Sequence, residues 1–201
     1  AQVRTLIEHG ARVFVAGLGV PREVVDLCHD HNVLVMSMCG KVRHAVAAVE
    51  AGCDLVVAQG TEAGGHTGQV ATMALVPQVV DAVGDRVPVV AAGGIVDGRG
   101  LAAALALGAD GIWVGTRFIA TPEAQAVPGY KEALVAGRED GTVVTRAYTG
   151  KTCRVVRNSY TNWWDDHPDE LSPFPQQFLR SLEDVANHLG LDESAEVDPD
   201  R

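Results

Sequence analysis

The sequence has few basic residues and no long apolar run. Its 201 residues include 16 lysines and arginines against 26 aspartates and glutamates, a formal net charge of -10 at pH 7. An acidic surface is not attracted to nucleic-acid phosphates or to anionic membranes, so the composition argues against both as partners. No stretch approaches the ~20 apolar residues that span a bilayer, and no basic segment followed by an apolar one opens the chain. We therefore expect a small molecule as the partner.

Cys-x-x-Cys pairs are also absent. The four cysteines are Cys28, Cys39, Cys53 and Cys153. The first three lie in apolar periodic segments, which favours buried free thiols in a reducing cytoplasm over a disulfide framework or a zinc site. The run His29–His31 is expected on the surface at a helix C-terminus rather than around a metal ion. We therefore expect a cytoplasmic protein with no metal site.

What the chain does contain is a repeated strand–helix unit. Five short, nearly continuous apolar runs are typical of strands buried on both faces, and Ala-rich segments with helical spacing separate them. The runs are Val13–Val15, Val33–Val35, Leu55–Val57, Val87–Val90 and Ile112–Val114. This alternation predicts an α/β fold with a parallel sheet. A glycine ends a helix shortly before a strand at three places, Gly10, Gly52 and Gly108. This recurrence favours a (β/α) barrel over a doubly wound sheet.

The composition changes towards the C-terminus. Six of the ten aromatic residues fall between Tyr148 and Phe178. A helix is expected from about Thr121 to Ala136, and an amphipathic segment with Phe178, Leu182, Val185 and Leu189 predicts another that ends at Gly190. We expect three regions: barrel units over 1–147, an aromatic-rich extension packed on them over 148–190, and a flexible acidic tail over 191–201. The aromatic residues Trp163, Trp164, Phe174 and Phe178 of the extension suggest a covered surface or a homodimer.

A glycine-rich loop with a histidine follows the third expected strand. Residues 59–69 read QGTEAGGHTGQ, and the four glycines let the backbone approach a ligand closely. Gln59 at the strand end offers hydrogen bonds, and His66 offers proton transfer near neutral pH. Barrel active sites lie where strands end and loops begin. The loop is therefore a candidate catalytic segment, and a solvated surface loop is the alternative.

Two more glycine-rich loops follow the last two expected strands. Ala91–Ile95 precedes Asp97, an expected helix N-cap, and Val114–Phe118 follows one strand–helix unit later. Backbone N–H groups at a helix start suit a phosphate, and neighbouring loops on the last two strands are the usual barrel phosphate site. The alternative is that the glycines only form turns. We predict phosphate binding by Gly93, Gly94, Gly115 and Thr116.

These three loops resemble the nitronate monooxygenases, formerly called 2-nitropropane dioxygenases. The resemblance is carried by Ala58–Gly68, Ala91–Ile95 and Gly115–Phe118, and it extends over about residues 1–160. The family consists of TIM-barrel flavoenzymes and includes flavin-dependent enoyl-acyl-carrier-protein reductases and related NAD(P)H-dependent reductases. Its Glu-Ala-Gly-Gly-His motif is specific to the superfamily but not to one activity.

The resemblance implies FMN as cofactor. Gln59 and Gly64 would meet the isoalloxazine or ribityl side, and the phosphate would lie on Gly93, Gly94, Gly115 and Thr116. His66 would be the catalytic histidine. In the monooxygenases such a histidine abstracts or steers the proton α to the nitro group, whereas in the reductases NAD(P)H is the electron donor and the histidine assists binding or protonation.

Two departures from the family pattern keep the activity open. Trp113 stands where the family often has glutamine, and Val35–Cys39 lacks the His-Lys of one monooxygenase subclass, whereas Met73–Val79 looks closer to the reductases. The leading hypothesis is a nitronate monooxygenase-like FMN oxidoreductase. The alternatives are an NAD(P)H-dependent FMN reductase of enoyl thioesters or quinones, and a flavin-free phosphate-binding barrel.

The length sharpens the expected architecture. A complete (β/α)8 barrel takes about 250 residues, and only five strand–helix units are evident. They correspond to the last five units of the resembled barrel. We therefore expect this chain to be the C-terminal part of a longer TIM barrel, followed by a helical extension.

Overall fold

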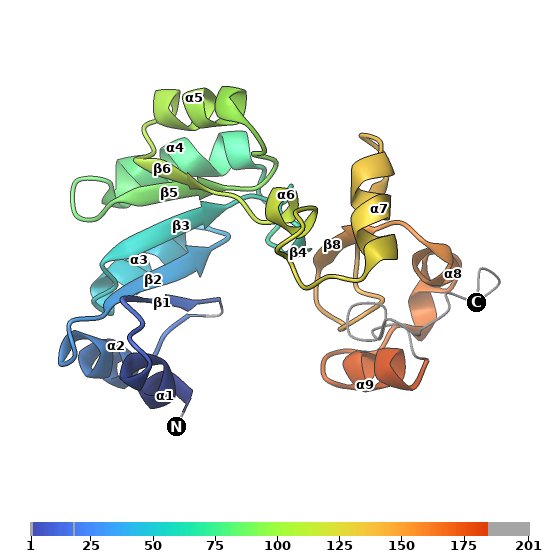
Figure 1. Cartoon of the computed structure of the whole chain (residues 1–201), viewed down its shortest axis with the longest axis horizontal. Helices are drawn as coiled ribbons and strands as arrows, with labels where there is room; N and C mark the ends of the chain where they lie inside the picture. Colours follow the sequence, from blue (N-terminus) through green and yellow to red (C-terminus); the bar gives the residue numbers. More distant parts are fainter. Residues whose placement is uncertain (1, 18, 185–201) are drawn as a thin grey trace. The chain divides into compact units, whose positions relative to one another are not determined.

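The described chain forms two compact units in the computed structural model (Figure 1). The structure describes residues 2–17 and 19–184. The first unit comprises residues up to 63 together with 68–114, and the second comprises 64–67 and the residues from 115 onward.

A five-stranded parallel sheet forms the first unit. Its spatial order is β1-β2-β3-β5-β6, and every neighbouring pair is parallel. The strands are β1 (Val13–Ala16), β2 (Leu34–Cys39), β3 (Leu55–Gln59), β5 (Val89–Ala92) and β6 (Gly111–Trp113). The five predicted strands are thus confirmed, with shifts of one to a few residues at their ends. Sequential order with parallel pairing is the pattern of a (β/α) array.

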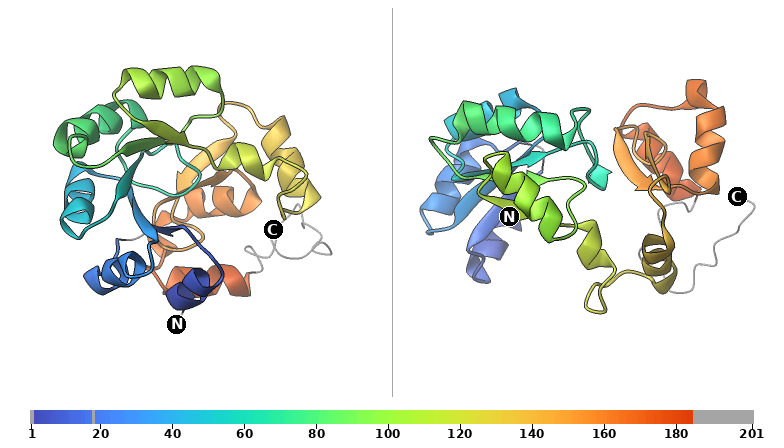
Figure 2. Two further views of the ribbon diagram at one scale, coloured as in Figure 1. Left: turned by 60° about the vertical axis from the view of Figure 1, so that its left-hand side comes forward. Right: turned by 90° about the horizontal axis from the view of Figure 1, so that it is seen from above.

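Helices alternate with the strands and pack on one side of this sheet (Figure 2, left). They are α1 (Gln2–Glu8), α2 (Arg22–His29), α3 (Val42–Glu50), α4 (Thr72–Val83) and α5 (Gly98–Ala106). Alternate strand residues, among them Val35, Val56 and Ala91, join the helices in the main buried cluster. The α/β class expected from the apolar runs is therefore confirmed.

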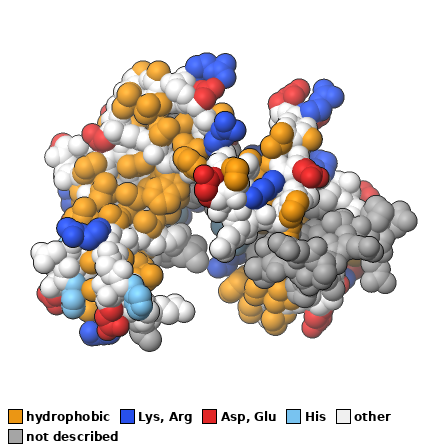
Figure 3. Space-filling view, viewed as in Figure 1, with side chains coloured by type: hydrophobic (Ala, Val, Ile, Leu, Met, Phe, Trp, Pro, Cys, Tyr) orange, Lys and Arg blue, Asp and Glu red, His pale blue; other side chains and the backbone are white. Residues whose placement is uncertain are grey.

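The opposite face of the sheet is apolar but less covered. Met36, Val57 and Ala92 form a second, smaller buried cluster there. Trp113 and Leu34 remain 40% and 47% exposed, and Figure 3 shows hydrophobic side chains gathered over this unit. Because strand side chains alternate, this is the face that lines the interior when such an array closes into a barrel.

Glycine ends the helices as predicted. Gly10, Gly52 and Gly108 have φ values of +83°, +100° and +89°, which only glycine adopts without strain. After the last two of these turns, an aspartate side chain forms a hydrogen bond to the backbone of the neighbouring strand. The carboxylate of Asp54 accepts the backbone N–H of Val35, and that of Asp110 accepts the backbone N–H of Val89.

The second unit is built on a small antiparallel sheet of order β4-β8-β7. Its strands are β4 (Gly65–His66), β7 (Thr142–Thr145) and β8 (Cys153–Val156). The helices are α6 (Thr116–Ile119), α7 (Pro128–Ala136), α8 (Ser159–Asp166), the 3-10 helix η1 (Pro168–Glu170) and α9 (Gln176–Glu183). This sheet was not anticipated, although the β-branched run of β7 is typical of a strand.

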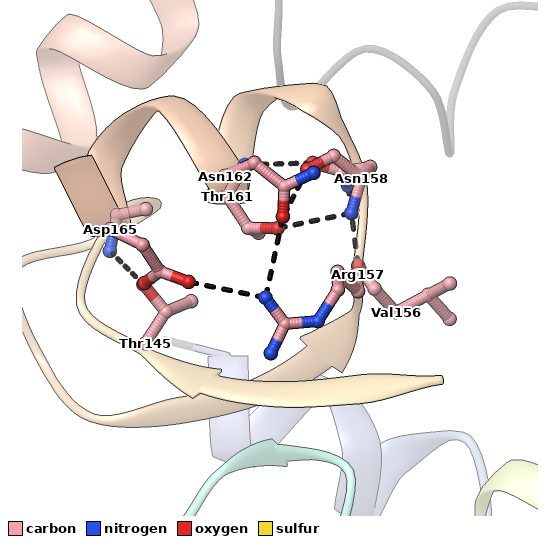
Figure 4. A network of polar contacts seen from close by, with 8 residues as sticks. Thr145, Val156, Arg157, Asn158, Thr161, Asn162 and Asp165 are labelled. Atoms are coloured by element: carbon pink, nitrogen blue, oxygen red, sulfur yellow. Dashed lines mark hydrogen bonds and ion pairs between the residues drawn. The ribbon is translucent and has the colours of Figure 1, made fainter. Parts of the chain in front are cut away.

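Helix α8 starts at a capping box, drawn in Figure 4. The Asn158 side chain accepts the backbone N–H of Thr161, and the Thr161 hydroxyl accepts the backbone N–H of Asn158. Arg157 donates to Asn162 and pairs with Asp165 at 3.2 Å on the same helix. The two capping-box contacts satisfy backbone N–H groups that a helix start otherwise leaves unpaired.

Two helix predictions for this unit need correction. The helix expected from Thr121 starts only at Pro128, because Val127 precedes a proline and is extended, with ψ 144°. In α9 the buried side chains are the polar Gln177 and Ser181, whereas Phe178 is 37% exposed. The remainder of the amphipathic segment, Val185, Leu189 and Gly190, and the tail 191–201 lie outside the described residues.

The cysteine prediction is confirmed, since all four cysteines are free and buried. Within residues 2–17 and 19–184 there is no cluster of three or more His, Cys, Asp or Glu side chains that could hold a metal ion. No helix in that described part is long and apolar enough to cross a membrane. The region boundaries expected at 147 and 190 stay predictions.

Candidate functional site

In the first unit, the end of β3 lies beside the end of β5. Gln59 is paired in register with Ala92, and the backbone N–H of Gly60 donates to the Ala92 carbonyl at 2.9 Å. Gly60 is packed so closely on Thr72 that a Cβ added to Gly60 would lie 2.5 Å from the backbone nitrogen of Thr72. The half-buried Gln59 therefore ends a rigid strand at the carboxyl edge of the sheet, where barrel active sites form.

Glu62 joins the glycine-rich loop to helix α4. Its carboxylate accepts the backbone N–H of Thr72 and lies 2.7 Å from the Thr72 hydroxyl. That hydroxyl also lies 3.0 Å from the carbonyl of Gly93. A carboxylate at a helix N-terminus is stabilised by the unpaired N–H groups there. Glu62 and Thr72 thus connect three segments of this edge: the loop after β3, the start of α4 and the loop after β5.

The predicted phosphate loop of the first unit has its amides available. Gly93 and Gly94 have φ values of +108° and +70°. Their backbone N–H groups donate no hydrogen bond to any residue that the structure describes. Asp97 caps α5 as predicted, accepting the N–H of Arg99, and the Arg99 side chain is the main reason that the pKa of Asp97 lies below its ordinary value. Two adjacent glycine amides without protein acceptors suit an anion.

His66 belongs to the second unit, on the short strand β4. It is paired with Cys153 of β8, and the Thr67 N–H that follows donates to the Thr152 carbonyl at 3.2 Å. Its ring atom Nε2 lies 2.9 Å from the hydroxyl oxygen of Thr149, and Nδ1 has no hydrogen bond with a described residue. The ring is exposed, so one nitrogen is held and the other is available.

Gly64 and Thr116 also meet in the second unit. A Cβ on Gly64 would lie 2.9 Å from the Thr116 hydroxyl oxygen, so the glycine is needed for this close approach. Gly115 and Thr116 are exposed at the start of α6, and their backbone N–H groups donate to none of the described residues. They share the feature that marks Gly93 and Gly94 in the first unit.

The predicted site residues therefore form groups within their own units. Gln59 lies near the Gly93–Gly94 loop in the first, and Gly64 lies against Thr116 in the second. Sequence reasoning missed Glu62, Thr72 and Thr149 as supporting residues. The position of Glu62 inside the Glu-Ala-Gly-Gly-His motif was a signal for the first, whereas nothing in the sequence pairs Thr149 with His66.

A parallel (β/α) array with glycine-rich loops at its strand ends is typical of TIM-barrel proteins. The model of the family described as "Nitronate monooxygenase" matches residues 1–192, and the chain belongs to that family. The resemblance drawn from the loop motifs is thereby confirmed. The Mycobacterium tuberculosis protein Rv1533, named as a monooxygenase, is 50% identical over 166 residues, which cover 81% of this chain and 44% of that protein.

Solved structures agree with this assignment. FabK from Thermotoga maritima matches with a TM-score of 0.85 and 35% identity over 99% of this chain and 61% of that one. A nitroalkane oxidase from Streptomyces ansochromogenes matches with a TM-score of 0.79 and 32% identity over 92% of this chain and 56% of that one. The chain spans about half the length of the curated relatives it matches.

Proposed function

We propose that this chain supplies the histidine and the anion-binding loops of an FMN-dependent oxidoreductase that oxidises alkyl nitronates with oxygen. The observation that carries the proposal is His66: a histidine of the family motif whose Nε2 is held while Nδ1 is available. Family membership and the likeness to a nitroalkane oxidase support the substrate class.

The glycine loops fit a phosphate group. Gly93 and Gly94 offer adjacent N–H groups with no described acceptor, in a positive-φ conformation that favours glycine, which has no side chain to cover them. Gly115 and Thr116 offer the same donors plus a hydroxyl. Within the first unit we assign Gln59 to the flavin ring or ribityl side and Gly93 and Gly94 to the FMN phosphate. Within the second unit we assign Gly64 to the flavin ring or ribityl side and Gly115 and Thr116 to the phosphate. When bound, FMN would supply the electron transfer that no side chain of this site provides.

The role assigned to His66 is proton handling at the substrate carbon next to the nitro group. An imidazole held at Nε2 presents Nδ1 in one orientation, and a neutral imidazole nitrogen can accept a proton near neutral pH. With a nitronate, which has already lost that proton, a ring nitrogen could orient the anion only as an N–H donor, in the protonated imidazolium. Both roles require that the ring does not rotate freely.

The test uses the full-length protein. We expect flavin absorbance after FMN addition and oxygen consumption with the anion of 2-nitropropane. His66→Ala should lower turnover while FMN stays bound. Rapid anaerobic bleaching of the flavin by NAD(P)H without nitronate turnover would instead assign the reductase of enoyl thioesters or quinones. No flavin absorbance after FMN addition would assign the flavin-free barrel.

A further inference from the structure

The turn that contacts His66 is itself firmly held. It spans residues 146–151 between β7 and β8, and the backbone N–H of Gly150 donates to the Arg146 carbonyl at 2.8 Å. The Arg146 side chain returns a hydrogen bond from Nε to the Gly150 carbonyl at 2.9 Å. Gly150 has φ +75° and packs on the backbone of Pro173 and Phe174.

Helix α9 fixes the same turn through buried polar side chains. Gln177 is fully buried and donates from Nε2 to the Ala147 carbonyl at 2.7 Å. Ser181 is also fully buried and donates to the Tyr148 carbonyl at 2.7 Å. Buried polar side chains are costly unless satisfied, so the unusual polar inner face of α9 is explained by its contacts with this turn.

Thr149, at the tip of this turn, has a hydroxyl with one proton and two lone pairs. The backbone N–H of Lys151 donates to its oxygen at 3.2 Å, and the Lys151 carbonyl accepts from it at 3.3 Å. One lone pair is left, and it faces Nε2 of His66 at 2.9 Å. All three hydrogen bonds are satisfied together only if Nε2 carries the proton and donates it.

We propose that Thr149 is the positioning residue of His66: its hydroxyl accepts from Nε2–H and so presents Nδ1, unprotonated, to the substrate. The inference rests on the catalytic role proposed for His66 and adds the tautomer and its cause. Helix α9 acts through the turn, which links the C-terminal extension to the histidine.

The tautomer is directly measurable. In the full chain labelled with 15N-histidine, long-range 1H–15N spectra at a pH where the ring is neutral should show His66 protonated at Nε2. The signal is assigned among the seven histidines by its loss in His66→Gln. In Thr149→Val the His66 shifts should move towards the mixture of tautomers of free histidine, and Thr149→Ser should restore them. A proton on Nδ1 in the wild type, or unchanged shifts in Thr149→Val, would overturn the proposal.

Kinetics provide the second readout. With neutral 2-nitropropane, which still carries the proton that an unprotonated Nδ1 would accept, Thr149→Val should lower kcat about tenfold at nearly constant KM and FMN content, since one orienting hydrogen bond is lost. Thr149→Ser should stay within about threefold of the wild type. Thr142→Val, which removes a hydroxyl bonded to Arg154 at the far end of β7, is the matched control and should leave kcat unchanged. Equal kcat in Thr149→Val and Thr142→Val would contradict a positioning role.

The two tests separate this inference from the proposed function. If His66→Ala leaves turnover unchanged, the catalytic role of His66 fails, whereas the NMR experiment still decides whether Thr149 sets the tautomer. If His66 is protonated at Nε2 but Thr149→Val leaves kcat unchanged, the contact is structural only and the positioning role is refuted.

Discussion

The carboxylate of Glu62 lies 2.7 Å from the hydroxyl of Thr72 and also accepts the Thr72 backbone N–H. A motif residue thereby caps a helix that starts ten residues later. The same hydroxyl reaches the Gly93 carbonyl, so the contact joins the loop after β3 to the proposed phosphate loop. Helix capping and site geometry therefore depend on one pair of side chains.

Loss of this cap should destabilise the first unit. Glu62→Ala removes a charged acceptor from two donors, and hydrogen bonds to charged groups contribute about 1.5–3 kcal/mol each, so we expect a loss of at least about 3 kcal/mol in the free energy of unfolding. Glu62→Gln keeps one acceptor oxygen and should lose less. Urea unfolding measures both. Asp81→Ala, an exposed change near the other end of α4, should stay within about 0.5 kcal/mol, and an equal loss there would contradict the capping role.

Gly60 provides a second test of this edge. Its missing side chain makes room for Thr72, and an added Cβ would collide with the Thr72 hydroxyl and backbone nitrogen. Gly60→Ala should cost about 1–3 kcal/mol, the usual penalty for overpacking. Gly98→Ala at the start of α5 meets nothing within 4 Å and should be neutral or stabilising by up to about 1 kcal/mol. The midpoint of thermal unfolding should therefore fall in Gly60→Ala. It should stay unchanged or rise in Gly98→Ala.

Gly94→Ala tests the proposed phosphate loop. Gly94 has φ +70°, where alanine is strained, and a Cβ there would lie 3.2 Å from the Cβ of Glu62. We expect the loop to shift and the FMN-to-protein ratio of the purified full-length protein to fall several-fold, with Gly98→Ala as the control. Full FMN retention in Gly94→Ala would argue against binding by these amides.

The first unit was predictable because its signals are local. Continuous apolar runs marked the five strands, and glycines at 10, 52 and 108 marked the helix ends, since both follow from short-range backbone preferences. The family resemblance, which predicts His66 and the glycine-rich loops as site residues, likewise rests on short contiguous motifs. All of these depend on residues that are close together in the sequence.

The second unit was harder for physical reasons. Strand β4 has two residues, and it forms only because β8 pairs with it from almost 90 positions away. Likewise, Gln177 and Ser181 looked like surface residues of an amphipathic helix, because nothing local shows that they bond to the carbonyls of Ala147 and Tyr148. Long-range pairing of backbone groups leaves no periodic signal in the sequence.

Burial, as the largest cause, raises the pKa of the Cys53 thiol from 9.0 to about 11. Between pH 9 and pH 11 the unfolded chain therefore loses the proton that the folded chain keeps. The unfolded state binds fewer protons in this window, so the free energy of unfolding must fall as pH rises. The loss from this thiol should reach roughly 2 kcal/mol.

Urea unfolding at pH 8, 9, 10 and 11 measures this slope. Cys53→Ala keeps a small apolar side chain but cannot ionise, so its slope should be smaller than that of the wild type. Alkylation by iodoacetamide offers a second measurement, because only the thiolate reacts. Cys53 should be modified far more slowly in the folded protein than in urea at pH 9. Identical pH slopes in the wild type and Cys53→Ala would show that the other buried groups, and not this thiol, determine the alkaline limit of stability.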